Sequence, residues 1–133
     1  MFFIPFDDPF REAILDTIKK YSDLYGKPLG SGRNRVTWRV DNEVIKVPTN
    51  EWGVRDNEHE ACFGQSYLNG ERKLARCRRQ DEPNGLPIVI MEYCIPYHKK
   101  ISYTELPEWT NWIDCQQVGF NPDGELVAYD YGL

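Results

Sequence analysis

The sequence lacks the features that would assign it to several common classes of protein. No apolar run approaches the roughly 18 residues of a membrane span, and residues 1–6 are too short and lack the basic start of a signal peptide. The four cysteines include no C-x-x-C pair, which argues against a zinc site. Neither histidine, His59 or His98, has a neighbour suited to ligation or catalysis, so both are expected at the surface. We therefore expect a reduced, cytoplasmic protein that does not associate with membranes.

A surplus of positive charge is also missing. The formal net charge is −5 and the pI is near 5.0, which argues against nucleic acid as a partner; residues 72–79 form only a local basic stretch. With 133 residues the chain is expected to form one domain over 1–133. Aromatic residues make up 14%, and most should belong to the core, although a protein-binding surface is the alternative.

The strongest pattern lies in residues 29–47, which predict a glycine-containing loop, a strand, a two-residue turn and a second strand. The turn residues Asp41 and Asn42 tolerate the positive φ angles of a tight hairpin, and this turn places Thr37 opposite Lys46. Because side chains alternate along a strand, one face is apolar, with Val36, Trp38, Val40, Ile45 and Val47. The other face carries Arg35, Thr37, Arg39, Val44 and Lys46. Three cations beside a glycine loop predict a site for phosphate or for a buried carboxylate.

An amphipathic helix is predicted before the hairpin, from about Asp8 to Tyr25. Asp8 and Pro9 suit the N-cap and the first helical position, and Gly26 suits the end of the helix. Apolar residues repeat at helical spacing, namely Phe10, Ile14, Ile18, Tyr21 and Tyr25. We expect this stripe to cover the apolar face of the hairpin.

A second helix is predicted over residues 51–69. Glu58 lies on the same face as Ala61, and a carboxylate that points toward a core must be paired. Lys46 is the nearest candidate partner on the sheet. Two alternatives stay open, namely that Glu60 is the partner of Lys46, or that Glu58 is simply exposed.

Short strands and turns are predicted in the remaining sequence. Residues 72–78 suit a basic strand, 81–85 a turn and 86–93 a buried strand, whereas 95–105 read as a loop and 106–112 as a short helix. A Pro-Asp-Gly turn then joins apolar runs and predicts a C-terminal hairpin. The fold class expected from these elements is α+β.

Taken in order, these elements resemble the N-lobe of protein kinases. Gly30 and Gly32 match the first two glycines of the G-x-G-x-x-G loop, and Lys46 matches the strand lysine, whose partner on the αC helix would be Glu58. The sequence Asp130-Tyr131-Gly132 is similar to D-F-G. The resemblance further implies a gatekeeper and a hinge at the end of the buried strand, with Met91 as gatekeeper and the backbone of Glu92 and Cys94 facing an adenine.

Other positions depart from the kinase pattern. Arg35 stands where the third glycine belongs, and Trp112, which cannot accept a proton, stands at the position of the catalytic aspartate. Gln117 replaces the metal-binding asparagine, and Asp114 is the only nearby carboxylate. Val44 replaces the alanine beside the adenine. These departures predict a protein without phosphotransferase activity.

The resemblance implies a kinase N-lobe-like antiparallel sheet with an αC-like helix, an added N-terminal helix and a C-terminal β-hairpin. Its parts are expected at 1–26 for the helix, 27–94 for the N-lobe-like sheet and helix, and 95–133 for a truncated C-terminal part with the C-lobe essentially absent. An unrelated small α+β fold is the competing interpretation.

The function implied by this resemblance is that of a pseudokinase that binds a protein partner. Small size and acidity suit a bacteriophage protein that modulates a host enzyme in the host cytoplasm, and the oligomeric state is left open. A dry ionic network in the cleft, with Asp130 and Glu58 satisfied by Lys46, Arg35 or Arg39, would leave no place for a cofactor.

The alternatives are a minimal ATP-binding phosphotransferase or a nucleotide sensor. In either case ATP and Mg²⁺ would be held by the glycine loop, Lys46 and Glu58, with Gln117 and Asp130 as metal ligands. A phosphotransferase would use Asp114 and Asp130 as its catalytic carboxylates.

Overall fold

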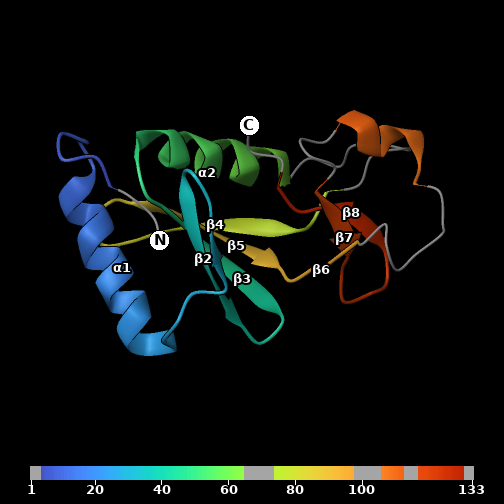
Figure 1. Cartoon of the computed structure of the whole chain (residues 1–133), viewed down its shortest axis with the longest axis horizontal. Helices are drawn as coiled ribbons and strands as arrows, with labels where there is room; N and C mark the ends of the chain where they lie inside the picture. The colour runs from blue at the N-terminus through green and yellow to red at the C-terminus, as the bar shows by residue number, and fades with distance from the viewer. Residues whose placement is uncertain (1–3, 65–73, 98–105, 113–116, 131–133) are drawn as a thin grey trace.

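The computed structural model describes residues 4–64, 74–97, 106–112 and 117–130 of the chain (Figure 1). Within these residues the fold is α+β, as predicted, with two α-helices, a five-stranded antiparallel sheet and a three-stranded antiparallel sheet. The large sheet has the order β1-β2-β3-β5-β4, with β1 (Gly30–Ser31), β2 (Arg35–Val40), β3 (Glu43–Pro48), β4 (Cys77–Asp81) and β5 (Pro87–Glu92). The small sheet has the order β6-β7-β8, with β6 (Ile95–Pro96), β7 (Val118–Phe120) and β8 (Leu126–Ala128).

The β2–β3 hairpin has the predicted register. Thr37 lies opposite Lys46, and Asp41 adopts a φ of 55° in the turn, the positive value that a tight hairpin requires. The apolar face of the hairpin is buried, whereas the face with Lys46 turns toward the second helix and the small sheet. Both assignments of side chains to faces are therefore confirmed.

Helix α1 (Arg11–Tyr25) covers the apolar face of the hairpin, where Tyr21 packs on Trp38. The helix begins later than predicted, because Asp8 caps other groups. The Asp8 carboxylate accepts the N–H of Phe10 at 2.9 Å with Oδ1 and the N–H of Glu51 at 2.8 Å with Oδ2. Asp8 thus ties the entry of α1 to the first residue of the second helix.

Helix α2 (Glu51–Gly64) lies on the opposite face of the large sheet, above β3, β4 and β5 (Figure 1). At Gly53 the helix lies directly against the β1–β2 loop, where a Cβ would lie 2.1 Å from the carbonyl oxygen of Asn34. Asn57 is fully buried, and its Nδ2 donates to the carbonyl oxygens of Lys46 at 3.0 Å and Pro87 at 2.9 Å. These contacts fix which residues of α2 face the sheet. The predicted continuation of this helix to residue 69 lies outside the described residues.

The other elements follow the prediction with shifted boundaries. The basic strand β4 spans Cys77–Asp81 instead of 72–78, and the turn that follows it is shifted by one residue, to 82–86. The expected loop at 95–105 begins with the short strand β6, and the predicted short helix is the 3-10 helix η1 (Glu108–Trp112). The C-terminal hairpin is confirmed as β7–β8.

Two further observations concern the surface of the described residues. His59 is exposed, as expected, whereas His98 lies outside the residues that the structure describes. Neither α1 nor α2, the helices of the described ranges, is long and apolar enough to cross a membrane.

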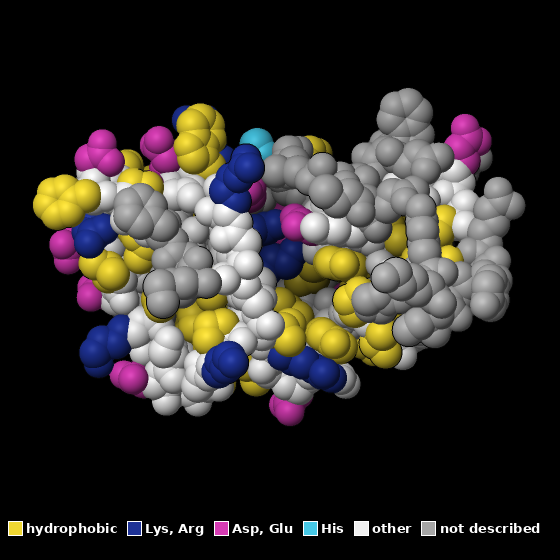
Figure 2. All heavy atoms as spheres, in the orientation of Figure 1, with side chains coloured by type: hydrophobic (Ala, Val, Ile, Leu, Met, Phe, Trp, Pro, Cys, Tyr) yellow, Lys and Arg dark blue, Asp and Glu magenta, His cyan; other side chains and the backbone are white. Residues whose placement is uncertain are grey.

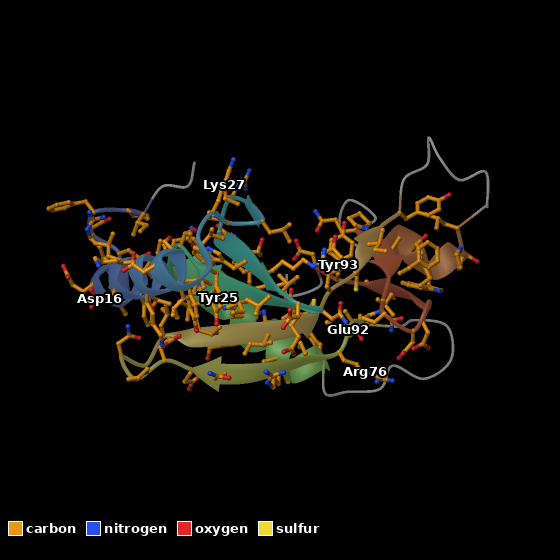
Figure 3. The ribbon with its side chains drawn as sticks, turned by 90° about the horizontal axis from the view of Figure 1, so that it is seen from below. Asp16, Tyr25, Lys27, Arg76, Glu92 and Tyr93 are labelled. Atoms are coloured by element: carbon orange, nitrogen blue, oxygen red, sulfur yellow. The ribbon has the colours of Figure 1, made fainter. Side chains whose placement is uncertain are left out.

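The two sheets meet at the end of β5. The N–H of Glu92 donates to the carbonyl oxygen of Arg76 at 2.9 Å, and the N–H of Arg76 donates back to Glu92 Oε1 at 3.0 Å. The same Oε1 accepts Asn121 Nδ2 of the small sheet at 3.2 Å. Figure 3 shows Arg76, Glu92 and Tyr93 at this junction. Glu92 therefore links the segments next to β4 and β7 at the junction of the two sheets.

Candidate functional site

A cleft of about 770 Å³ lies between the β1–β2 loop, the β5–β6 connection and the segment that follows β8. Pockets of roughly 300–1,000 Å³ are typical of small-molecule sites. Figure 2 shows basic and acidic side chains together in a hollow near the middle of this face, beside hydrophobic ones. The apolar lining includes Leu29, Val44, Met91, Cys94, Pro96 and Tyr129. The lining thus combines an apolar slot with a charged inner end.

Most of the residues that the sequence placed in the site line this cleft. They are Gly30, Gly32, Lys46, Met91, Glu92, Cys94, Gln117 and Asp130. Asp114 lies outside the described residues. The remaining predicted residue, Glu58, is not part of the lining.

The prediction that Glu58 pairs with Lys46 is wrong. Lys46 Nζ donates to Glu60 Oε1 at 2.6 Å, whereas Glu58 is exposed and lies 3.8 Å from Arg79. The physical reason is the phase of α2. Its buried face is centred near Asn57, so Glu60 points at the sheet, while the apolar residues alone suggested a face rotated toward Glu58.

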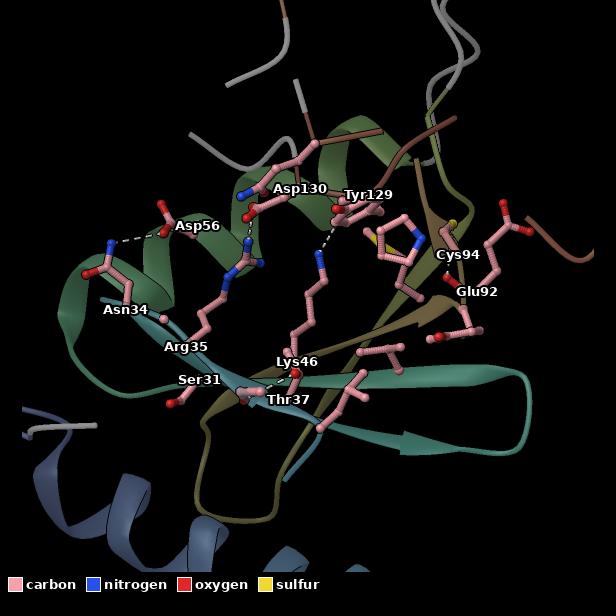
Figure 4. A pocket seen from close by; sticks show the side chains of 18 of the residues that line it. Ser31, Asn34, Arg35, Thr37, Lys46, Asp56, Glu92, Cys94, Tyr129 and Asp130 are labelled. Atoms are coloured by element: carbon pink, nitrogen blue, oxygen red, sulfur yellow. Dashed lines mark hydrogen bonds and ion pairs between the residues drawn. The ribbon is translucent and has the colours of Figure 1, made fainter. Parts of the chain in front are cut away.

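Arg35 joins two carboxylates at the inner end of the cleft. Its guanidinium is bidentate to Glu60, with Nη1–Oε1 at 2.8 Å and Nη2–Oε2 at 2.9 Å, and Nη2 also lies 2.5 Å from Asp130 Oδ1. Only 10% of the Arg35 side chain and none of the Glu60 side chain is exposed. Figure 4 shows Arg35 and Lys46 rising side by side from the sheet toward Asp130 and Tyr129.

Lys46 is held in the same place by a second acceptor. Its Nζ donates to the carbonyl oxygen of Tyr129 at 2.5 Å as well as to Glu60. We call Arg35, Lys46, Glu60 and Asp130 the ion-pair network. Its two cations and two carboxylates neutralise each other, so both cations that a phosphate group would need are already paired within the protein.

Burial and pairing act in opposite directions on the pKa values of the ion-pair network. Burial raises the pKa of Glu60, but contact with Lys46 and Arg35 lowers it by more than burial raises it, so its pKa lies below the usual value. Burial lowers the pKa of Lys46, and Glu60 only partly opposes this effect. Burial also raises the pKa of Asp130 despite its contact with Arg35. Glu60 is therefore the firmly ionised carboxylate of the network, and Asp130 is the one more easily protonated.

The opposite end of the cleft is formed by the β5–β6 connection. The N–H of Tyr97 donates to the carbonyl oxygen of Val118 at 3.0 Å. Burial raises the pKa of the Cys94 thiol to about 12, so the thiol is neutral at pH 7. This end of the cleft thus presents an uncharged side chain.

Sequence reasoning missed three contributors to the site. Asp56 lines the cleft and accepts Asn34 Nδ2 at 3.3 Å, Asn57 Oδ1 accepts Arg35 Nη1 at 3.2 Å, and Tyr129 acts through its carbonyl oxygen. The helical spacing of Gly53, Asn57 and Glu60 carried a signal for Asn57, because these three residues share one face of the helix. A backbone carbonyl has no sequence signal.

No protein-family model matches the chain, and no curated protein matches it. Among the described residues, no group of three or more His, Cys, Asp or Glu side chains is arranged to hold a metal ion.

Proposed function

We propose that the chain is a catalytically inactive, kinase-like protein that acts by binding a protein partner. The order of its elements supports the kinase-like assignment. The glycine loop, the strand lysine Lys46, the helix glutamate Glu60, the end of β5 and Asp130 of the D-Y-G sequence all meet at one cleft. In protein kinases a lysine–glutamate ion pair of this kind positions the phosphates of ATP.

The observation that carries the proposed inactivity is the contact between Arg35 and Asp130. The D-F-G aspartate of kinases holds Mg²⁺, whereas Asp130 holds a guanidinium that is also bidentate to Glu60. A magnesium ion held by Asp130 would have to displace this buried cation from that carboxylate. Trp112, at the position of the catalytic aspartate, supplies no general base.

Exposed aromatic residues on the outer face of α2 support a protein partner. Trp52 is 56% exposed beneath the guanidinium of Arg55 at 4.8 Å, and Phe63 is 45% exposed with its ring centre 6.4 Å from that of His59. These four residues follow the spacing of one helical face. Tryptophan and arginine are enriched among the residues that dominate binding energy in interfaces.

Transfer of labelled phosphate from ATP tests the proposed inactivity. The full chain is incubated with Mg²⁺ and γ-labelled ATP, with casein as acceptor, and autophosphorylation is measured in the same samples. We expect no incorporation above a protein-free control. Magnesium-dependent incorporation that Asp130→Ala abolishes would overturn the proposal and favour a minimal phosphotransferase.

The partner is tested by affinity capture from cells with matched variants. Wild-type protein and Leu24→Ala, a change at an exposed leucine of α1, should recover the same specific protein. The Trp52→Ala variant should lose it. Equal recovery by all three proteins would remove the outer face of α2 from consideration, and recovery of no specific protein would count against the partner role.

A further inference from the structure

We propose that two copies of the chain form a dimer in which their β4 strands pair side by side in antiparallel directions, centred on Gln80. Strand β4 is one edge of the large sheet, whose order is β1-β2-β3-β5-β4. The dimer goes beyond the proposed partner role and does not depend on it, because it uses a strand edge and not the aromatic side chains of α2.

The outer side of β4 is open to a second strand. Its residues from Arg78 to Asp81 are exposed, because α2 contacts β3, β5 and β4 and is therefore centred above β5. In Figure 3 the yellow-green β4 is the outermost strand, at the lower margin of the ribbon. Within the described ranges no strand of this sheet lies beyond β4. The open stretch begins with β4 itself, because the N–H of Ala75, just before it, donates to the carbonyl oxygen of Ala128 at 2.8 Å.

Hydrogen bonds at both ends of the β4–β5 pair fix the direction of the backbone groups of β4. At one end the N–H of Glu92 donates to the carbonyl oxygen of Arg76 at 2.9 Å, and at the other end the N–H of Glu82 donates to the carbonyl oxygen of Leu86 at 2.9 Å. The register between these ends is unbroken. Directly opposite residues of an antiparallel pair alternate between bonded and non-bonded positions. Every second residue counted from Arg76 therefore directs its N–H and carbonyl groups toward β5.

The residues in between direct their backbone groups outward. Arg78 and Gln80 face β5 with these groups, whereas Arg79 and Asp81 present them at the free edge. The residue opposite Asp81 is Pro87, which has no N–H and so suits a non-bonded position. Outward N–H and carbonyl groups on an edge strand are a template for another strand. A second β4 centred on Gln80 brings Asp81 of the second copy opposite Arg79, and each such pair exchanges both of its backbone hydrogen bonds.

The side chains of this register are complementary in charge. Arg79 and Asp81 lie on the face of the sheet that carries α2, where Arg79 is 3.8 Å from Glu58. Within one chain Arg79 Nε lies 2.6 Å from Asp81 Oδ1, and the two side chains are 42% and 48% exposed. In the dimer each Arg79 has a carboxylate on both sides, one in its own strand and one across the strand pair. Opposite charges directly across a strand pair stabilise it.

The order of the charges selects this register and this partner. Charged side chains on an edge strand often keep copies apart, but the sequence R-R-Q-D-E of residues 78–82 is complementary to itself when one copy is reversed. Glu82 is already bonded to Lys20 at 2.8 Å, so the selection comes from the Arg79–Asp81 pairs. Centring the pair on Arg79 would place two arginines directly opposite each other, which is unfavourable. Centring it on Gln80 gives a two-fold axis, and the assembly closes as a dimer.

Sedimentation velocity of the full chain from low micromolar to millimolar concentration tests the dimer. We expect a reversible equilibrium between monomer and dimer that added salt weakens, because the pairs that select the register are exposed ion pairs. A chain that stays monomeric over this range would overturn the proposal. Oligomers that keep growing with concentration would overturn it too, since the pairing closes at two copies.

Two charge reversals test the register. Arg79→Glu places carboxylates opposite each other and should weaken dimerisation by more than about tenfold, and Asp81→Arg should weaken it as much by placing cations opposite each other. A mixture of the two variants restores opposite charges at both positions, so it should form a mixed dimer at the concentration at which the wild type dimerises. Dimerisation of either variant alone at the wild-type level, or a mixture that stays monomeric, would refute the register.

Two controls separate the β4 edge from the rest of the surface. Arg33→Glu makes the same change of charge in the exposed β1–β2 loop and should dimerise like the wild type; circular dichroism confirms that each variant is folded. Trp52→Ala should also dimerise normally, and loss of the dimer in this variant would move the interface to α2 and refute the proposal. Arg79→Glu should still capture the protein partner, so the dimer and the partner role can fail independently.

Amide hydrogen exchange followed by NMR tests the pairing of the backbone groups. The N–H groups of Arg79 and Asp81 should exchange freely in dilute protein and become protected at concentrations at which the dimer forms. Those of Arg78 and Gln80, which face β5, should be protected at both concentrations. A sample that has dimerised without added protection at Arg79 and Asp81 would place the interface elsewhere and refute the proposal.

Discussion

Replacing Glu60 by glutamine keeps the size of the side chain and removes the charge that two buried cations share. In the variant, Lys46 at 7% side-chain exposure retains only the carbonyl of Tyr129 and an amide oxygen, and Arg35 retains Asp130. Breaking a buried ion pair by removing one partner costs about 3–5 kcal/mol. We therefore expect Glu60→Gln to lower the free energy of unfolding by this amount. For a chain of this size, such a loss corresponds to a decrease of about 10–20 °C in Tm.

Glu58→Gln is the matched control, because it makes the same chemical change two residues away on the same helix. Glu58 and its neighbour Arg79 are 48% and 42% exposed, and such surface pairs contribute about 0–1 kcal/mol. Urea denaturation at pH 7 measures both variants against the wild type. Similar small losses in the two variants would refute the conclusion that Glu60 is a buried, shared counter-ion.

Three further results are expected. The pKa of Glu60 lies below its ordinary value of 4.5, so its stabilising effect is complete at pH 7 and is lost as the pH falls from about 4.5 through the lower folded-state value. Urea unfolding should therefore show that the free energy of unfolding falls more steeply with acid in the wild type than in Glu60→Gln. Parallel pH curves for the two proteins would contradict this expectation. Asn57→Leu leaves the carbonyl oxygens of β3 and β5 without their donor, and should cost about 2–4 kcal/mol in urea denaturation, against a negligible change for Glu58→Gln. Arg35→Gly frees Asp130 and restores a kinase-like glycine, so ATP with Mg²⁺ should raise the Tm of this variant more than that of the wild type. Arg33→Gly, a control in the same loop, should behave like the wild type. Equal Tm shifts in all three proteins would show that Arg35 does not exclude the metal.

The β2–β3 hairpin was predictable because its information is local. A two-residue turn fixes the register, and the period of two then assigns every side chain to a face, including Lys46. The stripe of α1 was predictable for a similar reason. Its first turn was not, because Asp8 bonds to Phe10 and to Glu51, which lies 43 residues away. A cap recruited by another element cannot be distinguished from a local cap in the sequence.

The main error in predicting the site from the sequence concerned which face of α2 packs against the sheet. Hydropathy gives weight to Val54 and Ala61, but the buried face is set by polar contacts of Asn57 and by the absence of a side chain at Gly53. When Gly53 and Asn57 face the sheet, the carboxylate that reaches Lys46 is that of Glu60 and not that of Glu58. The sequence predicts Arg35, at the third-glycine position, as one of three candidate partners of a carboxylate. Its bridging of Glu60 and Asp130 depends on packing between distant segments.

The contact between Arg35 and Asp130 joins residues that are 95 positions apart. Closing so long a loop costs more chain entropy than forming the β2–β3 hairpin, so this contact should form late in folding. Until the segment after β8 docks, Lys46 lacks the carbonyl of Tyr129 and Arg35 lacks Asp130. The cleft is therefore completed only when the segment after β8 docks, and its charge balance exists only in the fully closed molecule.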